Sequence, residues 1–146
     1  MAETNPVRPL PCLCAELKRA SRAVTRLYDD AQRPLGLSSG QMTLLFALAN
    51  GPRSQTQLGE TFSMDTTTLT RTLRTLGREG YVATREGTAD RRERWHELTQ
   101  KGRQAVKRGN VLWRQVQGDF LRRLEGKVRF EEAQAVLHAI VAASEE

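Results

Sequence analysis

The stretch from position 54 to position 102 constrains the fold most, because it carries two short helix signals followed by a basic hairpin. Ser54 and Gln57 form an S-x-x-Q capping box, a pattern that begins many helices. Leu58 and Phe62 follow four residues apart, so they would share one face of that helix. The sequence therefore predicts a first helix of about two turns after Ser54.

A second helix is predicted directly afterwards. Asp65 is a favourable N-cap residue, and Leu69, Leu73 and Leu76 recur behind it at helical spacing. Gly80 stands where a helix of this length needs a left-handed residue at its end. We therefore expect a buried leucine stripe on one side of this helix and an exposed face on the other.

The exposed face of the second helix carries hydroxyl groups near its start and guanidinium groups further along. Its side chains are Thr66, Thr67, Thr70, Arg71, Arg74 and Arg78. Both kinds of side chain hydrogen-bond to phosphates and base edges, and the positive end of the helix dipole attracts an anion at a groove. This face therefore favours a polyanion as its ligand, with the threonines nearest the bases.

The pattern changes from helical to alternating after this helix. Tyr81 to Arg85 is predicted as a strand, Glu86 to Asp90 as a polar loop, and Glu93 to Leu98 as a return strand. The tip of this hairpin carries one carboxylate and three guanidinium groups, those of Asp90, Arg91, Arg92 and Arg94. The carboxylate can orient an arginine through a bidentate pair. Two helices and a basic hairpin in this order predict a winged helix-turn-helix.

Two motifs connect this prediction to a family. The pattern D-R-R-x5-L-T-x-x-G, from Asp90 to Gly102, resembles the wing-to-helix signature of the MarR family of bacterial transcriptional regulators. Upstream, Gly36 to Gln41 is similar to that family's G-L-T-x-x-Q motif at the start of its second helix. One departure is the return strand, because Arg94 to Glu97 is more polar than is usual in the family.

The resemblance covers nearly the whole chain and implies a homodimer that binds DNA. Each subunit would place its recognition helix in a major groove and one wing arginine in the flanking minor groove. The resemblance implies that Arg92 is this arginine, with Asp90 holding the wing and Arg91 beside it.

The distribution of charge agrees with a nucleic-acid partner. Residues 53–108 contain 12 Lys and Arg against 7 Asp and Glu, so this part carries +5 of the net charge of +6. Residues 109–146 carry −1 and lie outside the basic region. Scattered basic residues often mean only a solvated surface, but clustering on one helix face and one hairpin tip favours nucleic acid.

Helices are predicted on both sides of this core. Apolar residues with 4-3-4-3 spacing predict a first helix from about Cys12 to Arg33, a long helix runs from Thr99 towards Leu124, and a last one begins near Phe130. We expect a mainly α (α+β) fold in a single domain over residues 1–146. Its winged helix-turn-helix core would span 38–98, and its dimerisation region 12–34 with 99–146.

Catalysis has little support in the sequence. A glycine-rich phosphate loop, a G-x-S-x-G elbow and an H-E-x-x-H motif are all missing, and we expect neither a cofactor nor a metal site. His96 and His138 are isolated, and we expect each at the surface or an interface. The alternative to a DNA-binding protein is a winged-helix protein-interaction module, which should lack salt-dependent retention on duplex DNA.

The two cysteines leave several functions open. Cys12 and Cys14 form a C-x-C pair at a helix start, which is only half of a metal site. Both could be small packing residues at a dimer interface, or thiol sensors, since the first turn of a helix stabilises the oxidisable thiolate. Cys14 lies where the organic-hydroperoxide-sensing branch of the MarR family has its reactive cysteine. Tyr28 matches one tyrosine of that branch, whereas Lys18 stands at the position of another. A small-molecule effector is the third possibility.

The remaining segments predict no membrane attachment. Met1 to Pro11 has neither a signal peptide nor an anchor and is expected to be a loose arm. Met42 to Ala49 is the longest apolar run and is too short to span a bilayer, so the cytoplasm is the expected location. We expect a sequence-specific repressor that binds a palindromic operator as a homodimer and is released by a small-molecule or oxidative signal.

Overall fold

The computed structural model describes residues 11–145, so the expected N-terminal arm up to position 10 lies outside the described residues. The helices and strands, in chain order, are α1 (Leu13–Gln32), the short 3-10 helix η1 (Arg33–Leu35), α2 (Ser39–Ala47), β1 (Arg53–Ser54), α3 (Gln55–Phe62), α4 (Thr66–Arg78), β2 (Val82–Glu86), β3 (Arg94–Leu98), α5 (Gln100–Glu125) and α6 (Phe130–Ser144). This confirms the predicted mainly α (α+β) fold. Within residues 11–145, no helix combines the length and the apolar character needed to cross a bilayer.

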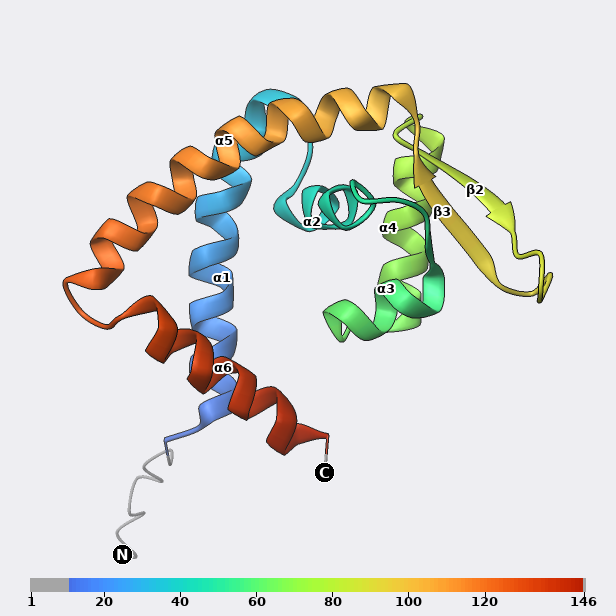
Figure 1. The fold of residues 1–146 in the computed structure, drawn as a ribbon. Coiled ribbons are helices and arrows are strands. Elements are labelled where there is room, and N and C mark those ends of the chain that lie inside the picture. Colours follow the sequence, from blue (N-terminus) through green and yellow to red (C-terminus); the bar gives the residue numbers. More distant parts are fainter. Residues whose placement is uncertain (1–10, 146) are drawn as a thin grey trace, which may run out of the picture.

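The elements lie in two groups that α5 connects. Figure 1 shows α2, α3, α4 and the β2–β3 hairpin gathered on one side, with α1 and α6 on the other. The long helix α5 begins at the root of the hairpin and packs along α1 before the chain turns back into α6.

The helix starts follow the predicted capping residues. Ser38 accepts a hydrogen bond from the backbone N–H of Gln41, whose side chain accepts from the Ser38 N–H, so both halves of a capping box form at α2. Ser54 and Gln57 form the same box at α3. Each box satisfies two backbone groups that a helix end leaves unpaired, which explains why α2 begins after Ser38 and why α3 begins after Ser54, as predicted.

The core lies beneath the helix-turn-helix and is built mainly from leucines. Its buried members are Leu37, Met42, Leu44, Leu45, Leu48, Leu58, Leu69, Leu73, Leu76, Val82, Leu98 and Ala105. On α2, Met42, Leu44 and Leu45 are buried, as is the C-cap residue Leu48, whereas Phe46 is only partly buried. Helix α2 is therefore buried on more than one side.

A glycine in the middle of α5 allows α2 to pack closely against it. Gly109 is buried, and a Cβ atom there would collide with the side chain of Met42 and lie 3.4 Å from Leu35 Cδ1. The glycine lowers helix propensity, but it leaves room for the end of the Met42 side chain, which would have to move aside for a larger residue.

The sheet has three antiparallel strands in the order β1-β3-β2. Val82 pairs with Leu98 at the root of the hairpin, and Arg53 pairs with His96 on the other edge of β3. Strand β1 was not predicted, because its two residues are too few to show alternation. The polar return strand nevertheless forms a regular ladder with β2, since backbone hydrogen bonds do not depend on side-chain polarity.

Candidate nucleic-acid interface

Helix α4 has one buried side and one exposed side, as its sequence predicted. Leu69, Leu73 and Leu76 are at most 3% exposed and fix the orientation of the helix. At its start, the Thr68 N–H donates to Asp65 Oδ1 at 2.9 Å. Hydrogen bonds from Thr68, through its side chain and its backbone, hold the pKa of Asp65 below the ordinary value. The N-cap therefore remains a carboxylate at neutral pH.

Most residues predicted to contact DNA are exposed on this helix. Thr66, Thr67, Arg71 and Arg74 are exposed. Thr70 is partly buried, and its hydroxyl oxygen accepts a hydrogen bond from Gln55 Nε2 at 2.7 Å. The structure thus places these five positions on one helix face, which has the chemistry of a groove-binding surface.

The tip of the wing is shaped by Asp90 in a different way from that expected. The backbone N–H of Arg92 donates to Asp90 Oδ1 at 2.9 Å. The side chain of Arg92 approaches the same oxygen with one nitrogen only, Nε at 4.0 Å, so the expected bidentate pair is absent from the described residues. A carboxylate bound to the backbone turns the chain at this point, and it leaves the Arg92 side chain 96% exposed. Arg91 is also exposed.

The body of the wing is supported by contacts between its strands. The guanidinium of Arg85 lies 5.6 Å from the centre of the Trp95 ring on the facing strand, within range of a cation–π interaction. Arg94 Nη1 lies 4.0 Å from Glu86 Oε1 on the paired strand. The ion pair is exposed and Trp95 is only partly buried, so each contact contributes little stability individually.

His96 corrects an expectation, because it is buried and not at the surface. It is 3% exposed, and its Nδ1 lies 3.0 Å from Thr84 Oγ1 across the hairpin. Burial, and to a lesser extent repulsion from Arg94, lower the pKa of His96, so the imidazole is neutral at physiological pH. His96 shares the inward face of β3 with Leu98, and it lies with Leu73 and Gly77 of α4 around one cleft, which accounts for this burial.

A cleft of about 430 Å³ separates α4 from the wing, and His96 forms part of its lining. The other lining residues are Gln55, Thr70, Leu73, Arg74, Gly77, Arg78, Thr84 and Arg94. Three of these side chains are guanidinium groups, so the cleft is basic as well as adjacent to α4.

The root of the wing is tied to the start of α5 by Thr99 and Gly102. Thr99 Oγ1 donates to the Gly80 or the Tyr81 carbonyl oxygen, at 2.6 and 3.1 Å, and accepts from the Gly102 N–H at 3.1 Å. A Cβ atom on Gly102 would overlap the Tyr81 carbonyl oxygen. The L-T-x-x-G part of the motif thus has a physical basis, since a hydroxyl caps the helix and a glycine admits the carbonyl.

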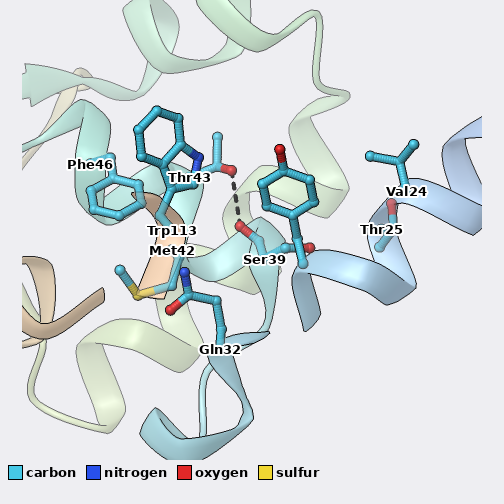
Figure 2. A pocket seen from close by; sticks show the side chains of 9 residues that line it. Val24, Thr25, Gln32, Ser39, Met42, Thr43, Phe46 and Trp113 are labelled. Atoms are coloured by element: carbon cyan, nitrogen blue, oxygen red, sulfur yellow. Dashed lines mark hydrogen bonds between the residues drawn. The ribbon is translucent and has the colours of Figure 1, made fainter. Parts of the chain in front are cut away.

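A second hollow lies away from this interface, between α1, α2 and α5. It measures about 300 Å³ and is lined by Val24, Thr25, Tyr28, Gln32, Ser39, Met42, Thr43, Phe46 and Trp113. Figure 2 shows side chains from all three helices around it, and the Thr43 hydroxyl donates a hydrogen bond to the Ser39 carbonyl oxygen. Sequence reasoning missed this pocket, because its residues come from three separate helices and share no motif.

The polar groups of this pocket are incompletely paired. Gln32 is 1% exposed; its Nε2 donates to the Gly109 carbonyl at 3.4 Å, while its Oε1 has no partner among the described residues. The hydroxyl of Tyr28 donates to Gln117, and burial raises the pKa of this tyrosine. No charged side chain of the described residues lines the pocket.

The candidate redox residues are not brought together within one chain. Cys12 is the N-cap residue of α1 without a side-chain cap, Cys14 lies in the first turn, and both are free and exposed. Tyr28 lies fourteen residues further along the same helix, about 21 Å away. In the described part of the chain, no three His, Cys, Asp or Glu side chains gather as a metal site would require.

Comparison with known proteins identifies this arrangement. Residues 35–93 match the profile of the MarR family. The chain is also 26% identical over 127 residues to the helix-turn-helix-type transcriptional regulator YwoH of Bacillus subtilis (strain 168), covering 86% of this chain and 89% of the relative.

Solved structures agree with the sequence matches. The transcriptional regulator MosR of M. tuberculosis, in complex with DNA, is 30% identical and has a TM-score of 0.83, covering 92% of this chain and 97% of MosR. A mutant MarR of E. coli complexed with operator DNA has a TM-score of 0.73 at 18% identity, covering 90% of this chain and 92% of that chain, and thus shares the fold. Family and fold are those of transcriptional regulators and not of enzymes. The chain belongs to the MarR family of DNA-binding transcriptional regulators.

Proposed function

We propose that this protein is a repressor that binds a palindromic operator as a homodimer and releases it on a small-molecule or oxidative signal. Helix α4 would enter a major groove, with Thr66, Thr67 and Thr70 nearest the bases, while Arg92 would enter the adjacent minor groove. The observation that carries the proposal is the exposed Thr and Arg face of α4 beside a wing whose arginine is held outward by Asp90.

The homodimer is supported by apolar surface on the terminal helices. Val136, Leu137 and Val141 of α6 are 58%, 52% and 47% exposed, and Leu13 of α1 is 60% exposed. A single chain of this size rarely leaves so much apolar surface in water. The dimerisation region would comprise residues 12–34 and 99–146, and the DNA-binding core residues 38–98. A two-fold dimer would present two recognition helices to two half-sites, which matches a palindrome.

The pocket between α1, α2 and α5 supports release by a small molecule. It is bordered by α1 and α5 of the proposed dimerisation region and by α2 of the DNA-binding core. A molecule bound there would contact the hydroxyl groups of Thr25 and Thr43 and the apolar side chains of Phe46 and Trp113. The same molecule would contact both the dimerisation region and the DNA-binding core, so it would change the separation of the two recognition helices.

The position of Cys14 supports release by oxidation. Its thiol is exposed in the first turn of α1, where an oxidant can reach it. Oxidation would add a polar or bulky group beside Leu13 and Leu17 in the proposed dimer seam. The partner for a disulfide would be the second subunit or a small thiol. Cys12 is the other candidate thiol.

The proposal is tested by selecting bound sequences from random duplex DNA, with and without an organic hydroperoxide. A symmetric pair of half-sites should be enriched, and binding should weaken steeply with salt. Enrichment of a single asymmetric site would contradict the palindrome, and failure to enrich any sequence would contradict specific binding. Cys14→Ser should keep the operator affinity and resist the peroxide. If peroxide releases wild type and variant equally, Cys14 is a packing residue.

A further inference from the structure

The threonine hydroxyls of α4 differ in whether they donate or accept hydrogen bonds. Thr72 and Thr75 donate to the backbone carbonyl four residues earlier in the helix, at 2.9 and 3.1 Å. Thr70, in contrast, accepts from Gln55 Nε2 at 2.7 Å. A hydroxyl has one proton and two lone pairs. Thr72 and Thr75 already donate their protons to the backbone, whereas the proton of Thr70 is free to donate to another acceptor.

We infer that Gln55 is a positioning residue that sets the direction of the Thr70 hydroxyl and thereby makes α4 read a hydrogen-bond acceptor at one base position. This inference rests on the proposed function, since it assumes that α4 enters a major groove. Gln55 need not touch DNA for this purpose, because its amide hydrogen occupies a Thr70 lone pair and directs the free proton elsewhere.

Gln55 is well fixed for this role. It is the first residue of α3, immediately after Ser54, which is 1% exposed and forms the capping box with Gln57. Strand β1 further anchors this point, because Ser54 pairs with Trp95 of the wing. Gln55 and Thr70 both line the basic cleft between α4 and the wing, so their polar groups border the surface that would meet DNA.

The base chemistry follows from the free proton. In the major groove, guanine N7 and O6, adenine N7 and thymine O4 accept hydrogen bonds, whereas cytosine N4 and adenine N6 donate them. A Thr70 hydroxyl held as a donor favours the accepting atoms at the base edge it faces and disfavours cytosine N4 there. If the proton instead meets a phosphate oxygen, the pair contributes affinity without any base preference.

The test reverses the direction of the hydroxyl. In Gln55→Glu the carboxylate at position 55 accepts the Thr70 proton and leaves Thr70 with lone pairs alone. The matched control is Gln57→Glu, which adds the same charge to the same helix and keeps the capping box, since glutamate also serves at that position. Both proteins are put through selection from random duplex DNA, and folding is checked by circular dichroism.

We expect Gln55→Glu to change the preferred base at one position in each half-site by about fivefold, the effect of one ordinary hydrogen bond, while Gln57→Glu weakens all sequences alike. The change should disappear in a Thr70→Val background. Gln55→Met, which carries no charge, should weaken the original preference without reversing it, and it serves as the second variant if Gln55→Glu does not fold.

Two results would overturn the inference while leaving the proposed function intact. One is that wild type, Gln55→Glu and Gln55→Met all select the same bases; the other is that the change persists without the Thr70 hydroxyl. If the wild-type protein enriches no sequence at all, the proposed function fails and the inference fails with it.

Discussion

Replacement of Gly102 by alanine tests the joint between the wing and α5. A Cβ atom at this position would lie well inside 3.0 Å of the Tyr81 carbonyl oxygen, and 3.1 Å from Leu98 Cδ2. The Tyr81 carbonyl is part of the backbone, so it cannot rotate away from the new Cβ atom as the end of a side chain would. Either α5 or the carbonyl must therefore move, and the carbonyl also accepts from the Thr99 N–H at 3.1 Å.

The magnitude follows from three contributions. Overpacking of this kind costs about 1–3 kcal/mol. Weakening the hydrogen bonds to the displaced carbonyl costs about 1 kcal/mol more. Alanine has a higher helix propensity than glycine, which adds about 1 kcal/mol to the stability of the variant. The expected net loss in unfolding free energy is about 1–3 kcal/mol, which lowers the melting temperature by roughly 3–10 °C for a chain of this length.

The assay is urea denaturation at a fixed protein concentration, with Gly40→Ala as the matched control. Gly40 also lies in the first turn of a helix, but its nearest neighbour to a new Cβ is Ser38 Oγ at 3.9 Å. Gly40→Ala should therefore raise stability by up to about 1 kcal/mol. The reasoning about the wing joint is refuted if the two substitutions change stability by the same amount or if Gly102→Ala is the more stable.

Three further predictions concern binding, assembly and pH. Arg92→Ala should weaken operator binding by about 1–3 kcal/mol in a filter or anisotropy assay with no change in the urea midpoint, and unchanged affinity at physiological salt would contradict a groove contact. Removal of residues 130–146 should abolish dimers in sedimentation analysis, and a well-folded truncated dimer would show that the interface lies elsewhere. His96 lines the cleft with three arginines, and its lowered pKa means that the folded chain favours the neutral imidazole. The contribution of His96 to the free energy of unfolding is therefore complete above about pH 6.5, and it is lost as the pH falls from there through the pKa of the folded state. The urea midpoint should thus fall more steeply between pH 7.5 and pH 5 for wild type than for His96→Asn, and equal slopes would contradict the assignment.

The features that were predicted from sequence are those with local causes. Capping boxes, the leucine stripe of α4 and the positive φ of 82° at Gly80 depend on residues within one or two turns, so their patterns are visible in the chain. The wing strands were placed to within one residue for the same reason, since their alternation is short-range.

Features that depend on distant segments were not predictable in this way. His96 is buried because it lies with Leu73 and Gly77 of α4 around one cleft, and the packing of α4 against the hairpin is not visible in the local pattern of β3. The hydrogen bond from Gln55 to Thr70 joins two helices whose relative angle no spacing rule supplies. Asp90 binds the backbone of Arg92 because the turn brings that N–H nearer than the flexible side chain.

Helix α5 can transmit a small rotation at one end of the chain to the other end, because it is long and continuous. It is one helix of 26 residues, about 39 Å long, with the Thr99 and Gly102 joint to the wing at one end and α6 at the other. A tilt of about 5° displaces one end by about 3 Å relative to the other, close to the rise of a single base pair. In the proposed dimer, a rotation too small to break any helix would move each wing by about one step along the DNA.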